Sequence, residues 1–512
     1  MLDGLDVQFI DLGPFPTPPH ELWARLDDIS RDRSMFRGIL TLFNDVYLPA
    51  ALPMYNALLP HVARDPPDAM VVDVGTLGAQ DVALRTHVVT VLNNPSIEFS
   101  VDGPPVYIPA WGTGFPLSMT LWSRCLNVLF PRLLSVALTP PFMHLNKLRW
   151  EHSMPPHRSQ HDLFQRARVL MNTAFGLDYA RPLPPLVDAV GPLLHPPGEE
   201  GPDAPPLHRP VRRWLEGGGE ATRVVYVSFG SMVQLQVQQL RVLTEALRHP
   251  RLRVLWTAPA EVIKRLPSNL PSSMRVKRIG SVPHLRVLAH PAVRAVVSHC
   301  SLLGAQEPLF YGKPVLCIPF YADQPDVAAR VLDARAGLML HKQELTVESV
   351  RESVLALVQN ATFAQAAVRV SAALRAAGGL GRAADAVEQS IAVGTRHLVT
   401  SDVELPWHKS NMLDVAAVYV ALLVLLAVTL YLLVALMSAV VGRVVASFFP
   451  VLSDESLTSL LAGSNGAGGG GGEAAELQGL RGLGATDADR QLLDDTFRAY
   501  AEARVAVAAA AG

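Results

Sequence analysis

The stretch VVSHCSLLGAQEPLFYGKPVLCIPFYADQ, residues 296–324, contains two short apolar runs that flank a segment of helical composition. The runs at 295–298 and 314–318 are continuous, which is typical of strands buried on both faces of a sheet. The segment 304–311 between them predicts a helix. A strand, a helix and a second strand in this order predict a right-handed βαβ unit in a parallel sheet. Polar residues follow both strands, at the edge where doubly wound sheets bind their ligands.

The same alternation extends upstream of this unit. Strands are predicted at 224–229, 253–257 and 276–279, with helical segments between them. We therefore expect a doubly wound α/β domain over residues 223–400. The segment before it, 195–222, is rich in Pro and Gly and predicts an interdomain linker.

Residues 1–194 are expected to form a first Rossmann-like domain. A strand is predicted at 6–12, helices follow as far as residue 63, and the apolar run at 69–74 predicts a strand buried on both faces. The segment 103–149 is rich in Pro, Trp, Phe and Leu without a clean period, which suits the wall of an apolar pocket as well as an irregular core.

Composition limits the class of protein. The chain has 512 residues, enough for two domains, and its 44 Lys and Arg nearly balance its 46 Asp and Glu, so nucleic acid is not an expected partner. Cys125, Cys300 and Cys317 are widely spaced and odd in number, which predicts neither a disulfide framework nor a zinc site.

One segment predicts a membrane helix. Residues 415–441 carry no charge, and about 27 residues form a helix about 40 Å long, more than a bilayer core requires. A buried core helix would show polar residues every few positions. We expect a span at 413–441, a lipid bilayer as partner, and a low-complexity tail at 442–512. The acidic start of the chain predicts no signal peptide.

The polar residues at the strand ends suit a nucleotide sugar. His299 would lie near the diphosphate, Glu307 would accept from ribose hydroxyls, and Asp323 and Gln324 would contact the sugar. Each residue alone also fits a structural role. A second strand end, at Gly230 and Ser231, suits a phosphate, although taken alone it is better explained by a simple Ser N-cap.

The stretch 275–324 resembles the signature of the UDP-glycosyltransferase family, and the weaker resemblance covers roughly residues 6–400. Its matching residues are His299, Gly304, Glu307, Gly312, Pro314, Pro319, Asp323 and Gln324. The resemblance implies a GT-B-type pair of Rossmann-like domains with a C-terminal transmembrane helix. It also implies an enzyme that transfers a hexosyl group from a UDP-sugar to a small lipophilic acceptor hydroxyl, with inversion, without a metal or other cofactor. The implied location is the membrane of the endoplasmic reticulum.

The resemblance implies a catalytic role for Asp73, which in the family orients a catalytic His on an earlier strand. This chain starts at a later strand, so we expect that His to be missing. The alternative function is therefore a membrane-tethered UDP-sugar-binding protein, or an incomplete gene product, without that base. A third option, a dinucleotide-dependent oxidoreductase, is disfavoured because no GxGxxG follows a predicted strand.

The chain also departs from the family pattern near the donor. Ser281 and His284 stand where the family has a stacking Trp and a Gln, and both are expected to contact the donor. Cys300 and Ser301 stand where it has two Gly, and Leu303 where it has an Asn. We expect the side chains of Cys300 and Ser301 to impede an approach of phosphate to the backbone.

Overall fold

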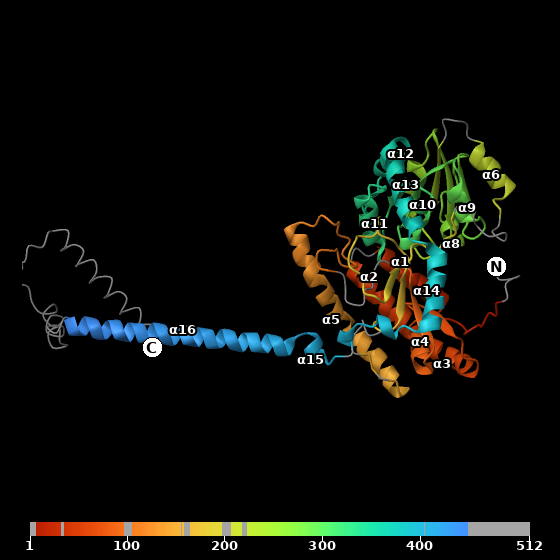
Figure 1. Ribbon diagram of the computed structural model, residues 1–512. Coiled ribbons are helices and arrows are strands. Elements are labelled where there is room, and N and C mark those ends of the chain that lie inside the picture. The colour runs from red at the N-terminus through yellow and green to blue at the C-terminus, as the bar shows by residue number, and fades with distance from the viewer. Residues whose placement is uncertain are drawn as a thin grey trace, which may run out of the picture. The chain divides into compact units, whose positions relative to one another are not determined.

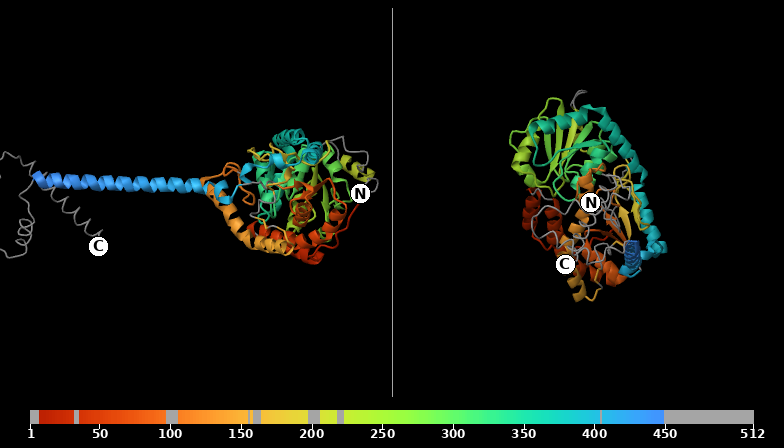
Figure 2. Two further views of the ribbon diagram at one scale, coloured as in Figure 1. Left: turned by 60° about the horizontal axis from the view of Figure 1, so that its bottom comes forward. Right: turned by 90° about the vertical axis from the view of Figure 1, so that its left-hand side faces the viewer.

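The structure is a computed structural model that describes residues 7–31, 35–96, 105–154, 156–157, 164–196, 206–217, 223–403 and 405–448. The chain divides into two compact units, one ending at Leu405 and one starting at Pro406. The first unit contains two parallel sheets, each with its own helices, which we call the first and second lobes (Figure 1). Figure 2 shows the same two lobes in two further views.

The first lobe contains a parallel sheet in the order β1-β2-β3-β4. Helices α3 and α4 pack against each other beside it, and α5 packs against α3. Its elements are β1 (Ala69–Asp73), β2 (Val89–Asn94), β3 (Arg168–Met171), β4 (Val187–Ala189), α3 (Leu48–Arg64), α4 (Leu77–Thr86) and α5 (Leu121–Glu151).

The prediction of a strand at 6–12 is wrong for residues 7–12, the part of it that the structure describes. Residues 7–12 are irregular, and the side chain of Phe9 is 77% exposed. The sheet order leaves β1 as the edge strand, so residues 7–12 pair with no strand in the described part of the chain. The predicted burial of the strand at 69–74 is also wrong, because Val71 of β1 is 57% exposed. An apolar run of this length does not by itself distinguish a central strand from an edge strand.

The helices predicted upstream of residue 63 are confirmed. Helix α1 (Pro19–Arg31) comes first, and α2 (Met35–Leu42) then runs through a five-residue π-helix, η1 (Phe43–Tyr47), into α3. The segment 103–149, which lacks a clean period in sequence, mostly forms the continuous helix α5. Three prolines interrupt its sequence pattern, yet from Leu138 to Arg149 its buried positions recur every three to four residues.

The second lobe contains a larger parallel sheet in the order β10-β9-β8-β5-β6-β7, which confirms the doubly wound α/β prediction. Its strands are β5 (Arg223–Ser228), β6 (Leu252–Ala258), β7 (Met274–Arg278), β8 (Val293–Ser298), β9 (Val315–Cys317) and β10 (Gly337–Met339). Its helices are α6 (Arg209–Glu216), α7 (Val237–Ala246), α8 (Ala260–Lys264), α9 (His284–Ala289), α10 (Leu302–Phe310), α11 (Gln324–Asp333), α12 (Val347–Gln359) and α13 (Ala361–Ala376).

Two helices connect the lobes. Ile29 of α1 lies in the core of the second lobe, beside strands β5 and β6. Helix α14 (Gly379–Val393) follows the second lobe in sequence but packs on the first, where Ala383 and Ala386 contact Val91. Within the predicted linker, helix α6 buries Trp214 against the second sheet. The domain boundaries inferred from sequence remain predictions.

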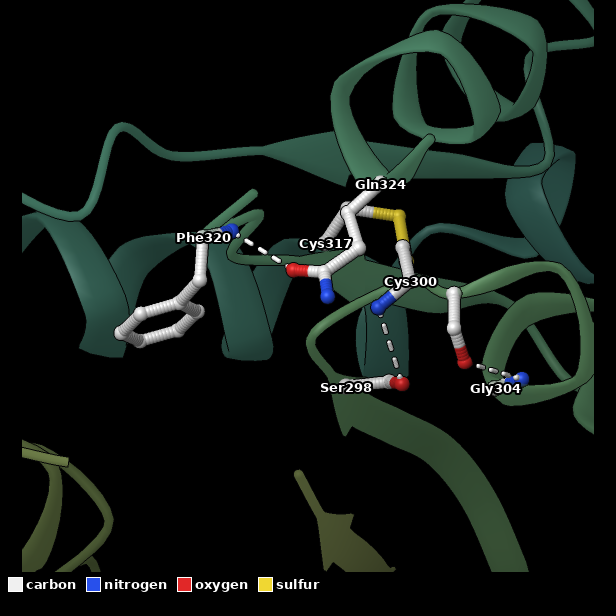
Figure 3. The surroundings of a disulfide bond; sticks show 7 residues. Ser298, Cys300, Gly304, Cys317, Phe320 and Gln324 are labelled. Atoms are coloured by element: carbon white, nitrogen blue, oxygen red, sulfur yellow. Dashed lines mark hydrogen bonds between the residues drawn. A yellow bond between two sulfur atoms is a disulfide. The ribbon is translucent and has the colours of Figure 1, made fainter. Parts of the chain in front are cut away.

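The cysteine prediction is wrong, because a disulfide joins Cys300 to Cys317 (Figure 3). Both residues are fully buried. Strands β8 and β9 are parallel neighbours in which Ser298 is aligned with Cys317, so their carboxyl ends lie side by side. Wide spacing in sequence therefore does not separate these residues in space. Cys125, on α5, is free and exposed.

The second unit contains α15 (Trp407–Ser410) and α16 (Leu413–Phe448) after two short 3-10 turns, η2 (Arg396–Leu398) and η3 (Ser401–Val403), that end the first unit. Helix α16 is long and apolar enough to cross a bilayer, as predicted from sequence. Residues 442–448 of the predicted tail belong to this helix, and residues 449–512 lie outside the described residues.

Candidate functional site

A cavity of about 580 Å³ lies at the carboxyl edge of the second sheet. Its floor includes Tyr226 and Ser228 of β5, Thr257 of β6 and Ser298 of β8. The hydroxyl groups of Tyr226 and Thr257 are 2.7 Å apart and buried. Burial raises the pKa of Tyr226 to about 12, so the phenol is neutral. A polar floor at the strand ends is where a parallel sheet with this winding binds a ligand.

His299 lines this cavity and lies between the backbones of Gly230 and Gly304. A Cβ added to Gly230 would lie 3.0 Å from the imidazole Cε1, and one added to Gly304 would lie 3.1 Å from the same atom. Both glycines are therefore needed to give the ring room. Burial lowers the pKa of His299 to about 4. The neutral ring can donate one hydrogen bond to a phosphate but carries no positive charge toward it.

The turn after β5 presents Gly230 and Ser231 to the cavity. Gly230 has a φ of +66°, a left-handed conformation that favours glycine. The N-cap explanation for Ser231 is wrong, because α7 begins six residues later and its N-cap is Gln236. Ser231 is exposed, so its hydroxyl can reach a ligand in the cavity.

The N-terminus of α10 opens onto the cavity next to His299. Ser301 is the N-cap, and its hydroxyl accepts from the Gly304 amide at 3.2 Å. The obstruction expected from Cys300 is absent, since its side chain is fully buried in the disulfide and does not line the cavity. Cys300 has a φ of +56°, so it reproduces the backbone shape that a glycine adopts more easily. Leu303 does line the cavity, with 43% of its surface exposed.

His284 and Glu307 form a pair on one wall of the cavity. The His284 Nε2 lies 3.3 Å from the Glu307 Oε1, and both residues line the cavity. The hydrogen bond to Glu307 raises the pKa of His284. The pair comes from α9 and α10, which contact each other. It holds the Glu307 carboxylate in place while leaving its second oxygen able to accept from a ligand.

Asp323 and Gln324 also line the cavity, at the start of α11. The Gln324 Oε1 accepts from the Phe320 amide at 2.8 Å (Figure 3) and from the Tyr321 amide at 3.2 Å. Its amide group is thus fixed by the loop that follows β9. The Asp323 carboxylate accepts from the Ser96 hydroxyl of the first lobe at 3.1 Å. Asp323 therefore belongs to the contact between the lobes as well as to the cavity.

Two of the predicted site residues lie outside the cavity lining. The Ser281 hydroxyl donates to the Arg278 carbonyl at 2.6 Å, and Ile279 and Gly280 line the cavity in its place. Asp73 ends β1, and its Oδ1 accepts from the Gly75 amide at 2.8 Å. The other predicted residues are brought together around the cavity: Gly230, Ser231, His284, His299, Gly304, Glu307, Asp323 and Gln324.

Tyr47 is a cavity residue that the sequence reasoning missed. It lines the cavity from the first lobe and ends the π-helix η1. Its ring lies beside the turn after β1, because a Cβ on Gly75 would lie 3.0 Å from the Tyr47 Cε1 and 3.2 Å from the Asp73 Oδ1. Burial raises the pKa of Tyr47, and the charges of Asp73 and Asp323 raise it further. Single π-helical turns are frequent at functional sites but leave no sequence signal.

Beside the cavity, a buried ionic network joins the lobes. Asp326 of α11 accepts from the amides of Gly112 and Gly114, both at 2.7 Å. Burial raises the pKa of Asp326 to about 6, against the opposing charge of Arg330. The Arg330 Nε donates to the Asp178 Oδ1 at 2.6 Å. This network fixes the loop before α5 of the first lobe to a helix of the second.

The two parallel sheets, each with its own helices, have the arrangement of the GT-B fold. The structure is similar to that of the glycotransferase of kitacinnamycin, with a TM-score of 0.51 and 19% identity, over 74% of this chain and 85% of that one. This likeness confirms the predicted fold class.

Residues 68–446, more than half of the chain, match the family described as UDP-glucoronosyl and UDP-glucosyl transferase. The chain belongs to this family, as its motifs predicted.

Among named relatives, the chain is 28% identical to UDP-glucuronosyltransferase 3A1 of Mus musculus over 367 residues, which cover 66% of each protein. It is 26% identical to UDP-glucuronosyltransferase 1A3 of Homo sapiens over 414 residues, covering 77% of this chain and 74% of that one. The chain thus spans just under two thirds of the length of the first of these relatives.

Proposed function

We propose that the chain transfers a hexosyl group from a UDP-sugar to the hydroxyl of a small lipophilic acceptor, with inversion and without a metal ion. The family membership supports glycosyl transfer from a UDP-sugar. The observation that carries the proposal is that eight residues predicted from sequence to bind the donor line one cavity of about 580 Å³. This volume lies within the range of small-molecule sites.

In this proposal the second lobe holds the donor. The diphosphate lies at the N-terminus of α10, where backbone amides and the neutral His299 ring donate to it. Glu307, steadied by His284, accepts from the ribose hydroxyls. Asp323 and Gln324 contact the sugar, and Gly230 and Ser231 close the phosphate side.

The acceptor is proposed to approach from the first lobe, on the side of Tyr47. Attack from that side, opposite the departing UDP, inverts the anomeric carbon. The His that Asp73 orients in the family mechanism is expected to be missing here, so we propose that the Asp73 carboxylate itself takes the proton of the acceptor hydroxyl as its oxygen bonds to the anomeric carbon and the bond to UDP breaks. Burial and the charges of Asp73 and Asp323 raise the pKa of Tyr47, so its phenol is neutral and can orient either the acceptor hydroxyl or the sugar.

The test is transfer by the purified full chain. It is incubated with radiolabelled UDP-glucose or UDP-glucuronic acid and a panel of hydrophobic alcohols, with and without a chelator. Labelled product of inverted configuration at an unchanged rate in chelator supports the proposal. Binding of UDP-sugar without transfer would favour the alternative function, a membrane-tethered UDP-sugar-binding protein. Absence of both binding and transfer would end both proposals.

We further propose that α16 crosses the membrane of the endoplasmic reticulum and that the lobes face its lumen. The Cys300–Cys317 disulfide suits an oxidising compartment. Asn360 begins an Asn-Ala-Thr glycosylation sequon, and this residue is exposed before α13. A mobility shift after endoglycosidase treatment, lost in Asn360→Gln, is expected. An unglycosylated chain with reduced Cys300 and Cys317 would contradict the lumenal location.

A further inference from the structure

Helix α5 carries an apolar stripe on its outer face. Along this face, exposed side chains recur at a spacing of three or four residues, which places them on one side of a helix. The large apolar members are Trp122, Leu129, Leu133, Val136, Met143 and Trp150, with exposed fractions of 46% to 75%. Free Cys125 is exposed one turn after Trp122. Figures 1 and 2 show α5 along the outside of the first lobe.

The opposite face of α5 is fixed to the first lobe. The buried residues are Asn127, Leu138, Pro141, Leu145 and Arg149. The Asn127 side chain accepts from the Ala110 amide at 2.6 Å and donates to the Ile108 carbonyl at 2.9 Å, and Arg149 pairs with buried Asp81. A helix with one face in a protein core and buried polar contacts does not itself cross a bilayer, although its length and composition would permit this.

The charges of α5 are almost all positive. Arg124, Arg132 and Lys147 are exposed, while Glu151, at the last position, is the single acidic residue of the helix. Lys147 and Glu151 lie 4.0 Å apart. Cations around an apolar face, with Trp at both ends, are the composition of a helix that lies at a lipid surface.

We propose that the outer face of α5 lies in the interfacial region of a lipid bilayer and is a second membrane contact of this chain. The stripe extends along a helix of 31 residues, about 46 Å. Soluble proteins rarely expose an apolar face of this extent. The face belongs to no part of the donor cavity, since none of the cavity-lining residues comes from α5.

The chain itself indicates lipid as the occupant. Residues 406–412 link the first unit to α16, an apolar helix with no part buried in protein. This inference rests on the proposed insertion of α16. A short link to an inserted helix keeps the lobes at a high effective concentration near the bilayer, so that even a weak interfacial contact is populated. Tryptophan side chains prefer this interface, where the ring is buried and its N–H meets water.

Cys125 allows a direct test, because the chain has three cysteines and the other two form the disulfide. The full chain is labelled there with a polarity-sensitive fluorophore and added to phosphatidylcholine–phosphatidylserine vesicles. We expect a blue shift of emission and its quenching by lipids spin-labelled near the headgroup. Alkaline extraction of the same vesicles reports separately whether α16 is inserted, and the transfer assay reports the proposed function.

A matched pair of substitutions provides the control. Val136, on the stripe, and Val393, at the end of α14, are 72% and 71% exposed. Val136→Asp should reduce the quenching at Cys125, whereas Val393→Asp should leave it unchanged. A label that stays in water would overturn the proposal. So would a label whose shift grows with protein density and ignores the spin-labelled lipid, since that would identify a second copy of the chain as the occupant.

Discussion

The two lobes differ in how their strands and polar side chains are held. In the second lobe the central strands β5, β6 and β8 are buried, and they end in the polar groups that line the cavity. In the first lobe the edge strand β1 exposes Val71, and Asp73 at its end lies outside the cavity lining. The comparison indicates that the proposed donor side is formed by the edge of a buried sheet, while the proposed acceptor side depends on helical segments such as the π-helical turn that carries Tyr47.

The largest effect is expected from the disulfide, which the second lobe has and the first lacks. Replacing Cys300 and Cys317 together by Ser should lower the free energy of unfolding by about 3 kcal/mol, the value for a closed loop of this length. It should also weaken UDP binding, because Cys300 follows His299 directly. Cys125→Ser in the first lobe is the control and should change neither. Denaturant unfolding and calorimetric titration with UDP measure the two quantities, and equal behaviour of the three chains would contradict a structural role for the disulfide.

The next largest effect, on UDP binding, compares two Glu–His pairs, one inside the cavity and one outside it. Glu307 pairs with His284 in the cavity, whereas Glu216 lies 3.6 Å from His290 away from it. Glu307→Gln should weaken UDP binding about 10- to 100-fold, equivalent to losing about 1.5–3 kcal/mol from hydrogen bonds to a charged group. Glu216→Gln should leave binding unchanged. Titration with UDP and with uracil would show whether the loss requires the ribose, and a loss of uracil binding alone would contradict the assigned role.

The lobes also predict opposing effects of acid on stability. In the folded chain the pKa of His299 is lowered from 6.5 to about 4. In the unfolded chain this histidine therefore takes up a proton at a higher pH, and the free energy of unfolding falls as the pH drops from 6.5 toward 4. In the folded chain the pKa of Asp326, between the lobes, is raised from 3.8 to about 6. The folded chain therefore takes up this proton at a higher pH than the unfolded chain, and the contribution of Asp326 to the free energy of unfolding increases as the pH drops through 6.

Two variants separate these contributions. His299→Asn should flatten the loss of stability between pH 6.5 and 4. Asp326→Asn should steepen it, and should lower stability by about 1–3 kcal/mol near neutral pH because Gly112 or Gly114 loses an acceptor. Unfolding curves at several pH values measure both slopes. If the free energy of unfolding had the same pH dependence in both variants and in the parent chain, the shifted pKa values of His299 and Asp326 would be contradicted.

The smallest effect is expected from Tyr47 in the first lobe. Tyr47→Phe removes one neutral hydroxyl and should slow transfer by the equivalent of about 1 kcal/mol, roughly fivefold, with UDP affinity unchanged. Its neighbour on the same π-turn, Phe43, lies outside the cavity lining, so Phe43→Tyr serves as a control. An altered UDP affinity in Tyr47→Phe would place Tyr47 on the donor rather than on the acceptor side.

Much of the second lobe could be predicted from the sequence because its signals are local. Alternating strands and helices predicted the sheet, the end of one strand predicted His299, and the helix that follows it predicted Glu307. The disulfide could not be predicted, because it depends on β8 and β9 being neighbours. In the first lobe, the exposed edge at Val71 depends on which strands pair with β1, and apolar composition does not encode this.

The position of Tyr47 in the cavity could not be predicted from the sequence either. A π-helical turn has no sequence signature, so the side chain that it directs into the cavity was not found. Ser281 shows the converse error, in which a residue aligned with a family position turns its hydroxyl to the Arg278 carbonyl instead. Local pattern thus predicts which strand ends carry a site, while the direction of individual side chains requires the packed structure.

The most direct test of the account is photoaffinity labelling of the full chain with 5-azido-UDP, followed by mass spectrometry of the labelled peptide. We predict modification within the segment from Ile279 to His284 at the cavity wall, prevented by excess UDP and not by CMP. Modification confined to the first lobe, or labelling that UDP fails to prevent, would contradict a UDP-sugar site at the carboxyl edge of the second sheet.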